Sequence, residues 1–275
     1  MGNFLEIISI LQLFLWVIIY LHLMNHETFT ILLWTQILIS IPVFIILFFL
    51  PAPYGKHLKT SWGPTIPSKY AWVLMEFPAV MVMLTIFIVN YAEQELVSFV
   101  FLLIWLSHYI YRTFIYPFRT NNPSKPFPIV IALFGFIFNC LNGIINGVYL
   151  FEIRVIENIE WLSSPVFVMG LAVFILGMII NKKGESDVRN LKRDKENNYV
   201  VPSGGLLNIV CNPHYFGELI QWLGWAILCW SPAGLAFFVF TFANLFPRAI
   251  LNLRWYKKQF PDFPPERKAI IPYII

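Results

Sequence analysis

The amino-acid sequence predicts an all-α protein, a polytopic bundle of helices that crosses a membrane several times. Apolar residues make up 58% of the 275 residues and charged residues only 12%, whereas soluble domains have about half and about a quarter. Apolar runs of about 20 residues recur along the chain, and each is long enough to cross the ~30 Å hydrocarbon core as a helix. This composition does not fit a soluble domain, and residues 1–275 are expected to form a single membrane-embedded domain.

Eight apolar segments are candidate membrane spans. The first, residues 4–24, has neither the n-region charges nor the cleavage site of a signal peptide, so we expect it to be retained as a span. Ser231 and Pro232 lie where the last two segments meet, which predicts either a tight hairpin or one kinked helix. The remaining candidates are residues 28–50, 70–91, 96–117, 127–150, 163–181, 214–230 and 232–253.

Basic residues gather in alternate loops, as they do on the cytoplasmic side of membrane proteins. Lysines and arginines follow the second, fourth and sixth predicted spans and occupy the C-terminal tail, whereas the opposite loops carry glutamates and a single basic residue, Arg154. With eight spans, both termini are expected in the cytoplasm. Orientation alone therefore accounts for the formal net charge of +4, and no nucleic-acid partner is implied.

Motifs for metals and nucleotides are missing from the sequence. Cys140, Cys211 and Cys229 have no metal-ligand spacing and are expected to be buried thiols, and no zinc site is predicted. Neither GxGxxG nor GxxxxGK[ST] occurs. The basic segments, residues 182–193 with Arg248 and Arg254, are the candidates for binding a phosphate.

Three groups of polar residues interrupt the apolar spans, where an ionisable side chain is costly unless it faces a cavity or a partner. The first is Glu76, which is either a catalytic acid or a carboxylate that reaches water from a helix end. In the second, Tyr109, Arg112, Thr113 and Tyr116 fall on one helical face, because offsets of three, four and seven return to the same side. Residues of an aromatic belt and positive-inside residues are the alternative explanation for that face.

The third group lies at the start of the seventh span, in the segment CNPHYFGELIQW. Offsets of four and three place His214, Glu218 and Gln221 on one face of the predicted helix, where they could line a polar pocket. A histidine at a helix start can also serve as a cap.

Several segments occur in a fixed order from residue 54 to the C-terminus: YGKH, MEFP, HYIYRTFIYP, ILGMIIN, VPSGGL, HYFGELIQWLGWA, RAILNLRWYKKQF and RKAIIPYII. Together they resemble the steroid 5α-reductase family, the 3-oxo-5α-steroid 4-dehydrogenases. The resemblance implies seven transmembrane helices, so that residues 4–24 would be an addition. It also implies NADPH as the cofactor, at a site that faces the cytoplasm, and saturation of the C=C bond of a lipid-soluble enone, most simply a Δ4-3-ketosteroid.

The resemblance extends to single positions. Glu76 and Tyr109 match the catalytic acid and tyrosine that contact the substrate carbonyl. Lys192, in the basic loop, is expected to bind the 2′-phosphate together with Arg189. The other positions that match or accompany the cofactor site are Arg112, Lys125, Asn181, Glu185, Tyr199, His214, Glu218, Arg248, Asn252 and Tyr256.

Four positions depart from the family pattern. Met75, His214, Glu185 and Asn252 stand where relatives often have Gln, Asn, Asp and His, respectively. These departures concern the identity of the substrate and the details of cofactor binding, whereas the reaction class stays as implied.

Two other functions compete with the reductase. Membrane methyltransferases of the isoprenylcysteine or phospholipid type, which use S-adenosylmethionine, also have a helix that starts with an NPHYFGE-like segment. MEFP and HYIYRTFIYP favour the reductase. A non-enzymatic lipid carrier or channel would leave the aligned polar side chains unexplained. Among substrates, another cyclic enone, a polyprenol or an enoyl thioester remains open, and membrane lipid is the expected surrounding.

Overall fold

A computed structural model describes residues 25–58, 60–91, 95–156, 158–191 and 200–275. The predicted span of residues 4–24 lies outside the described residues, and so do Lys192 and Tyr199. The long helices are α2 (His26–Phe49), α3 (Ser68–Val89), α4 (Leu96–Ile110), α6 (Ile129–Val148), α7 (Pro165–Arg189), α8 (Pro213–Cys229) and α9 (Pro232–Gln259). Short α5 (Tyr116–Arg119) prolongs α4, and two three-residue strands, β1 (Thr65–Pro67) and β2 (Pro126–Pro128), pair antiparallel.

Six helical stretches in the described part of the chain are long and apolar enough to cross a membrane. The prediction of an all-α polytopic bundle is therefore confirmed. Apolar side chains also cover the outside of the bundle: Leu103, Ile137 and Ile179 are each about 60% exposed, at 64%, 61% and 59%. Such a surface suits contact with lipid tails.

The last two helices form a tight hairpin, one of the two arrangements that the sequence left open. Trp230 ends α8 with left-handed backbone angles, φ 46° and ψ 51°. The Ser231 side chain then caps α9 by accepting a hydrogen bond from the Gly234 amide at 2.9 Å. The chain reverses within two residues, and α8 packs against α9.

Helices α7 and α8 touch along their backbones because each carries glycine at intervals of seven residues. A Cβ atom on Gly177 would lie 2.2 Å from the Gln221 nitrogen, and one on Gly217 would lie 2.2 Å from the Asn181 nitrogen. Small residues allow this close approach of membrane helices. The contact lets the Asn181 side chain reach across to α8, where Nδ2 donates to the His214 carbonyl at 2.9 Å.

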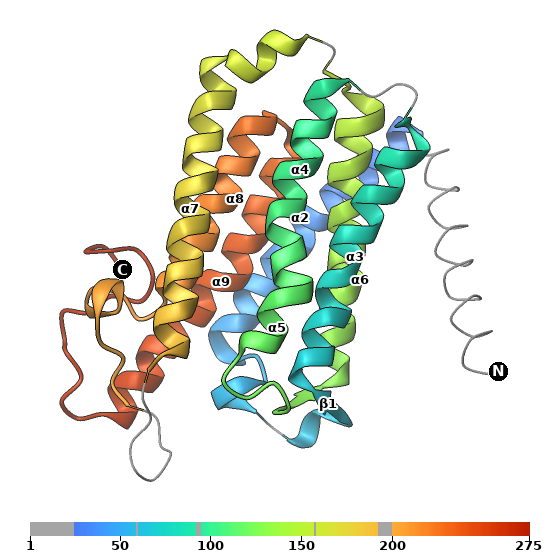
Figure 1. Cartoon of the computed structure of the whole chain (residues 1–275). Coiled ribbons are helices and arrows are strands. Elements are labelled where there is room, and N and C mark those ends of the chain that lie inside the picture. The colour runs from blue at the N-terminus through green and yellow to red at the C-terminus, as the bar shows by residue number, and fades with distance from the viewer. Residues whose placement is uncertain (1–24, 59, 92–94, 157, 192–199) are drawn as a thin grey trace.

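The parts of the chain that the sequence predicts to be basic lie at one end of the bundle (Figure 1). There lie the loop after α2, strand β1, helix α5 and the C-terminal ends of α7 and α9. The β1–β2 pairing and a hydrogen bond from the Ser68 amide to the Lys125 carbonyl, 2.9 Å, join the start of α3 to the start of α6. This end of the bundle also holds the polar side chains described next.

Candidate active site

A cavity of about 520 Å³ lies between the helices toward that end. One side of it is apolar and is formed mainly by Val43, Ile46, Leu47, Phe134, Phe138, Phe237 and Phe240 from α2, α6 and α9. The other side is polar and is formed by Glu76, His108, Tyr109, Arg112, Asn139, Glu185, His214, Glu218 and Arg248. Its size and its mixed walls are those of a site for a mostly apolar ligand that is oriented by a few polar contacts.

Arg112 links two carboxylates across the cavity. Its Nε donates to Glu76 at 3.2 Å, and its Nη1 donates to Glu185 at 2.5 Å. The guanidinium also lies over the rings of Trp72 and Tyr116, 4.6 and 4.4 Å from their centroids. All three charged side chains are largely buried, so the two ion pairs compensate charges that would otherwise be strongly disfavoured.

The helix that carries Arg112 widens at this point. Tyr111–Ile115 forms a π-helical segment between α4 and α5, closed by a hydrogen bond from the Tyr116 amide to the Tyr111 carbonyl. Pro117 explains the change, because it has no amide hydrogen for the Thr113 carbonyl one turn before it. π-helical segments are often found at functional sites. Tyr109, Arg112 and Tyr116 line the cavity together, as the predicted polar face requires, whereas Thr113, its fourth residue, does not line the cavity.

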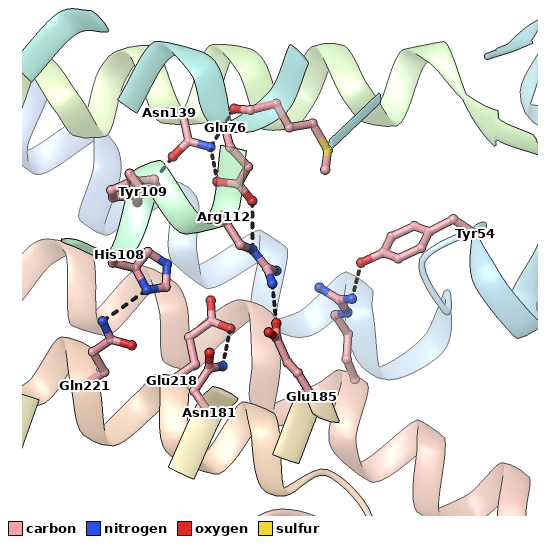
Figure 2. Close-up of polar contacts among 12 residues, drawn as sticks. Tyr54, Glu76, His108, Tyr109, Arg112, Asn139, Asn181, Glu185, Glu218 and Gln221 are labelled. Atoms are coloured by element: carbon pink, nitrogen blue, oxygen red, sulfur yellow. Dashed lines mark hydrogen bonds and ion pairs between the residues drawn. The ribbon is translucent and has the colours of Figure 1, made fainter. Parts of the chain in front are cut away.

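Glu76 and Tyr109 meet through a third residue, Asn139 (Figure 2). The Asn139 Nδ2 donates to the Met75 carbonyl at 2.7 Å and to the Glu76 carboxylate at 3.3 Å, and the Tyr109 hydroxyl donates to the Asn139 Oδ1 at 3.5 Å. Tyr109 is 3% exposed and packs against the rings of Trp105 and Trp222. A carboxylate and a phenol hydroxyl are thus held beside each other at the cavity wall.

Of the three polar residues predicted on α8, His214 and Glu218 line the cavity, whereas Gln221 does not and instead contacts His108. The Gln221 amide nitrogen lies 3.0 Å from the Nδ1 of His108, within hydrogen-bond distance. Asn181 contacts Glu218 through an Nδ2–Oε2 hydrogen bond of 3.4 Å. His214 lines the cavity, and its buried Nδ1 has no hydrogen-bond partner among the described residues.

A smaller pocket of about 160 Å³ adjoins the cavity. Arg248, which lines both, donates to the hydroxyls of Tyr54 and Tyr215. In the small pocket, Asn252 donates to the Asn212 Oδ1 at 2.7 Å. Lys56 also lines the pocket; its ammonium lies 4.1 Å from the Tyr256 ring centroid, and burial lowers its pKa to about 8.

Two predicted cofactor residues are not among those that line either pocket. Lys125 precedes β2, and Arg189 ends α7, where its Nη2 donates to the Ser186 hydroxyl at 3.1 Å. Of the other described residues predicted for the cofactor site, six line the cavity or the small pocket: Arg112, Glu185, His214, Glu218, Arg248 and Asn252. Asn181 and Tyr256 lie beside them. Among the described residues, no group of three His, Cys, Asp or Glu residues is arranged to hold a metal ion.

Sequence reasoning did not single out Asn139 or Tyr54. A signal for Asn139 was present, because Asn139, Asn142 and Asn146 stand three and four residues apart in an apolar span and share a helical face. Asn142 and Asn146 bind each other, and the Gln36 amide and the Trp225 indole donate to them from α2 and α8. Tyr54 lies in a loop, where no periodicity indicates the direction of a side chain.

Comparison with known sequences identifies the family. The sequence model of a family described as 3-oxo-5-alpha-steroid 4-dehydrogenase matches residues 125–275. The chain belongs to this family. Steroid 5-alpha-reductase DET2 of Arabidopsis thaliana is 41% identical over 247 residues, which cover 87% of this chain and 94% of the relative. The 3-oxo-5-alpha-steroid 4-dehydrogenase 1 of Bos taurus is 33% identical over 241 residues, with 86% and 93% covered.

Membership of the 3-oxo-5-alpha-steroid 4-dehydrogenase family makes the chain an oxidoreductase that acts on CH–CH groups. The human 3-oxo-5-alpha-steroid 4-dehydrogenase 1 is 33% identical over 227 residues, 80% of this chain and 85% of the relative. The resemblance read from the sequence motifs is confirmed, and the membrane methyltransferase and the lipid carrier are set aside.

Proposed function

We propose that the protein uses NADPH to reduce the C=C bond of a lipid-soluble α,β-unsaturated ketone, most simply a Δ4-3-ketosteroid. The observation that carries this proposal is the placement of Glu76, Asn139 and Tyr109 on the wall of a cavity whose other side is apolar. An apolar ring system suits the aromatic and aliphatic wall, and a ketone oxygen suits the Tyr109 hydroxyl. The names of the relatives support a steroid as the substrate.

The residues of the two pockets fit a nicotinamide dinucleotide. Two buried polar atoms, His214 Nδ1 and Glu185 Oε2, have no hydrogen-bond partner in the described part of the chain, and both belong to residues that line the cavity. Arg248 and Lys56 supply positive charge in the small pocket, as phosphate groups require. We infer that Glu185, His214, Glu218 and Arg248 hold the nucleotide, while Asn181 positions Glu218.

The proposed mechanism is a conjugate reduction. NADPH held by Glu185, His214, Glu218 and Arg248 would supply the hydride that the β-carbon of the enone receives. Tyr109 donates its O–H to the carbonyl oxygen, where negative charge accumulates as the enolate forms, and in a dry site this electrostatic stabilisation is usually the largest catalytic contribution. Glu76 orients the phenol. A proton that comes from solvent then adds to the α-carbon and completes the saturation.

A turnover screen tests this function directly. Purified protein is incubated with NADPH and a series of Δ4-3-ketosteroids, cyclic enones, polyprenols and enoyl thioesters, and products are identified by mass. We expect addition of two hydrogens to the ketosteroids. Binding of S-adenosylmethionine instead of NADPH, or no reduction of any enone, would contradict the proposal.

The cofactor site is proposed to face the cytoplasm. The cavity and the small pocket lie toward the bundle end that carries the basic loops, and basic loops stay on the cytoplasmic side. We expect Lys258→Cys, at the end of α9, to resist an impermeant thiol reagent in intact cells, and Glu160→Cys, at the opposite end, to react. Both variants are made with the three native cysteines replaced by alanine. The reverse labelling pattern would contradict the orientation.

A preference for NADPH over NADH is expected, and changing Arg189 or Lys192 to Ala is expected to reduce it. NADPH carries an additional 2′-phosphate, which arginine or lysine usually recognises. The ratio of kcat/KM for the two nucleotides measures the effect, and Lys258→Ala, an exposed cation at the same end of the bundle, is the matched control. Equal turnover of both nucleotides by the unaltered protein would overturn this expectation.

A further inference from the structure

The side-chain amide of Asn139 has only one orientation that satisfies its surroundings. Its Nδ2 meets two acceptors, the Met75 carbonyl and the Glu76 carboxylate, at 2.7 and 3.3 Å. The two hydrogens of the amide are thereby used, and Oδ1 must face the Tyr109 hydroxyl, 3.5 Å away. Because Oδ1 can only accept, the phenol is the donor in this contact. With 6% exposure, the amide has little access to water as an alternative partner.

Helix α6 brings this amide to α3 by a close packing contact. Gly135 stands one turn before Asn139, and a Cβ atom there would lie 2.8 Å from the Met75 Cγ. The glycine therefore gives room for the Met75 side chain, while Asn139 on the same face binds the Met75 carbonyl. A contact to the main chain of a packed helix fixes a side chain more firmly than a contact to another long side chain.

The hydrogen bonds at the two ends of the Asn139 amide differ in strength. The 2.7 Å hydrogen bond to Met75 is short for an N–H donor, whereas 3.5 Å is at the limit for a hydroxyl donor. Tyr109 can therefore exchange the Asn139 oxygen for another acceptor at little cost. Glu76 stays attached during that exchange, because it is bound through the other end of the amide and through Arg112.

We propose that Asn139 is a positioning residue for the reduction: it anchors Glu76 and directs the Tyr109 hydroxyl, which leaves Asn139 for the carbonyl oxygen of the substrate. This role rests on the proposed function. Asn139 itself does not touch the reacting atoms in this scheme. Its loss would let the phenol and the carboxylate adopt other rotamers, so that fewer bound substrates meet the hydroxyl in a productive geometry.

Four variants separate positioning from simple helix packing: Asn139→Leu, Tyr109→Phe, the double variant that combines them, and Asn146→Leu. Leucine has nearly the shape of asparagine and makes no hydrogen bonds. Asn146 is the matched control, because it is equally buried on α6 and bonded to Trp225, outside the residues that line the cavity. Turnover, KM, NADPH affinity by fluorescence and melting temperature are measured on each.

We expect Asn139→Leu to lower kcat by about 10- to 100-fold with NADPH affinity within about twofold, but to cost less than about threefold in the Tyr109→Phe background. Asn146→Leu should lower the melting temperature and keep kcat within about threefold. An equal loss in both backgrounds, or full kcat in folded Asn139→Leu, would overturn the proposal. If Asn139→Leu does not fold, Asn139→Cys replaces it under the same criteria.

A second measurement keeps this inference separate from the proposed function. If the unaltered protein reduces no enone, the function fails, and Asn139 is then judged by the affinity for a saturated 3-ketosteroid, which needs only the contact between carbonyl and phenol. We expect about tenfold weaker binding for Asn139→Leu and no further loss when it is added to Tyr109→Phe. Unchanged affinity in Asn139→Leu would overturn the positioning role.

Discussion

Tyr109→Phe and Glu76→Gln are each expected to lower turnover by about 10²-fold or more and to leave NADPH affinity nearly unchanged. Tyr109→Phe removes the O–H that stabilises the enolate oxygen. Glu76→Gln keeps the shape of the side chain but removes the charge that Arg112 and the Asn139 amide hold in place. Single-turnover kinetics and nucleotide titration on purified protein measure both quantities.

The double variant tests whether the two residues act as one unit. Groups that act through the same hydroxyl are not additive, so the combined loss should be far smaller than the product of the single losses. A Glu76 with a purely structural role would give normal specific activity with a lowered melting temperature. Full activity in a folded Tyr109→Phe protein would refute the assignment of the tyrosine.

The helices could be predicted from the sequence because lipid requires long, uninterrupted apolar segments. Six of the predicted spans overlap helices of the structure that are long and apolar enough to cross a membrane. The short α8 corresponds to the predicted span of residues 214–230. The helices extend beyond the apolar residues: α7 continues to Arg189 and α9 to Gln259, past the predicted ends at 181 and 253. Polar turns that project toward water carry no apolar signal, so hydropathy alone stops too early.

The resemblance read from the sequence implied that Glu76 and Tyr109 serve one site, and the antiparallel neighbours α3 and α4 hold them near each other, linked through Asn139. Contacts between helices that are far apart in the sequence could not be predicted from it. Arg112 reaches Glu185 on α7, and Asn139 reaches Met75 on α3, and such pairings depend on how each helix is rotated in the bundle. The π-helical turn after Ile110 changes that rotation further. Periodicity shows which face is polar, but not which helix that face meets.

The packing of α7 on α8 is a second case in which the sequence does not reveal which helix a face meets. Gly170, Gly177 and Gly184 repeat every seven residues on α7, and a Cβ atom on any of them would collide with the backbone of α8. This repeat sets the distance between Glu185 and the His214–Glu218 face. A repeat of glycines is visible in the sequence, yet its partner helix is identified only by the complementary glycines Gly217 and Gly224.

Arg112→Met is expected to be the most destabilising single change in the site, by about 3–5 kcal/mol, because it leaves Glu76 and Glu185 buried without their shared cation. Arg112→Lys should recover little of the loss. A lysine ammonium has no planar fork to bind two carboxylates at once, and it stacks less well on Trp72 and Tyr116. Thermal unfolding in one detergent, with Arg254→Met as the control for an exposed cation on α9, measures the difference.

The decisive variant combines Arg112→Met with Glu76→Gln and Glu185→Gln. If uncompensated charge is the cause of the instability, neutralising both carboxylates should restore most of the melting temperature, since replacing a whole buried ionic group costs far less than removing one member. Activity should stay lost in the triple variant, because Glu76 is absent. A triple variant no more stable than Arg112→Met would show that Arg112 contributes through packing on Trp72 and Tyr116 rather than through its two ion pairs.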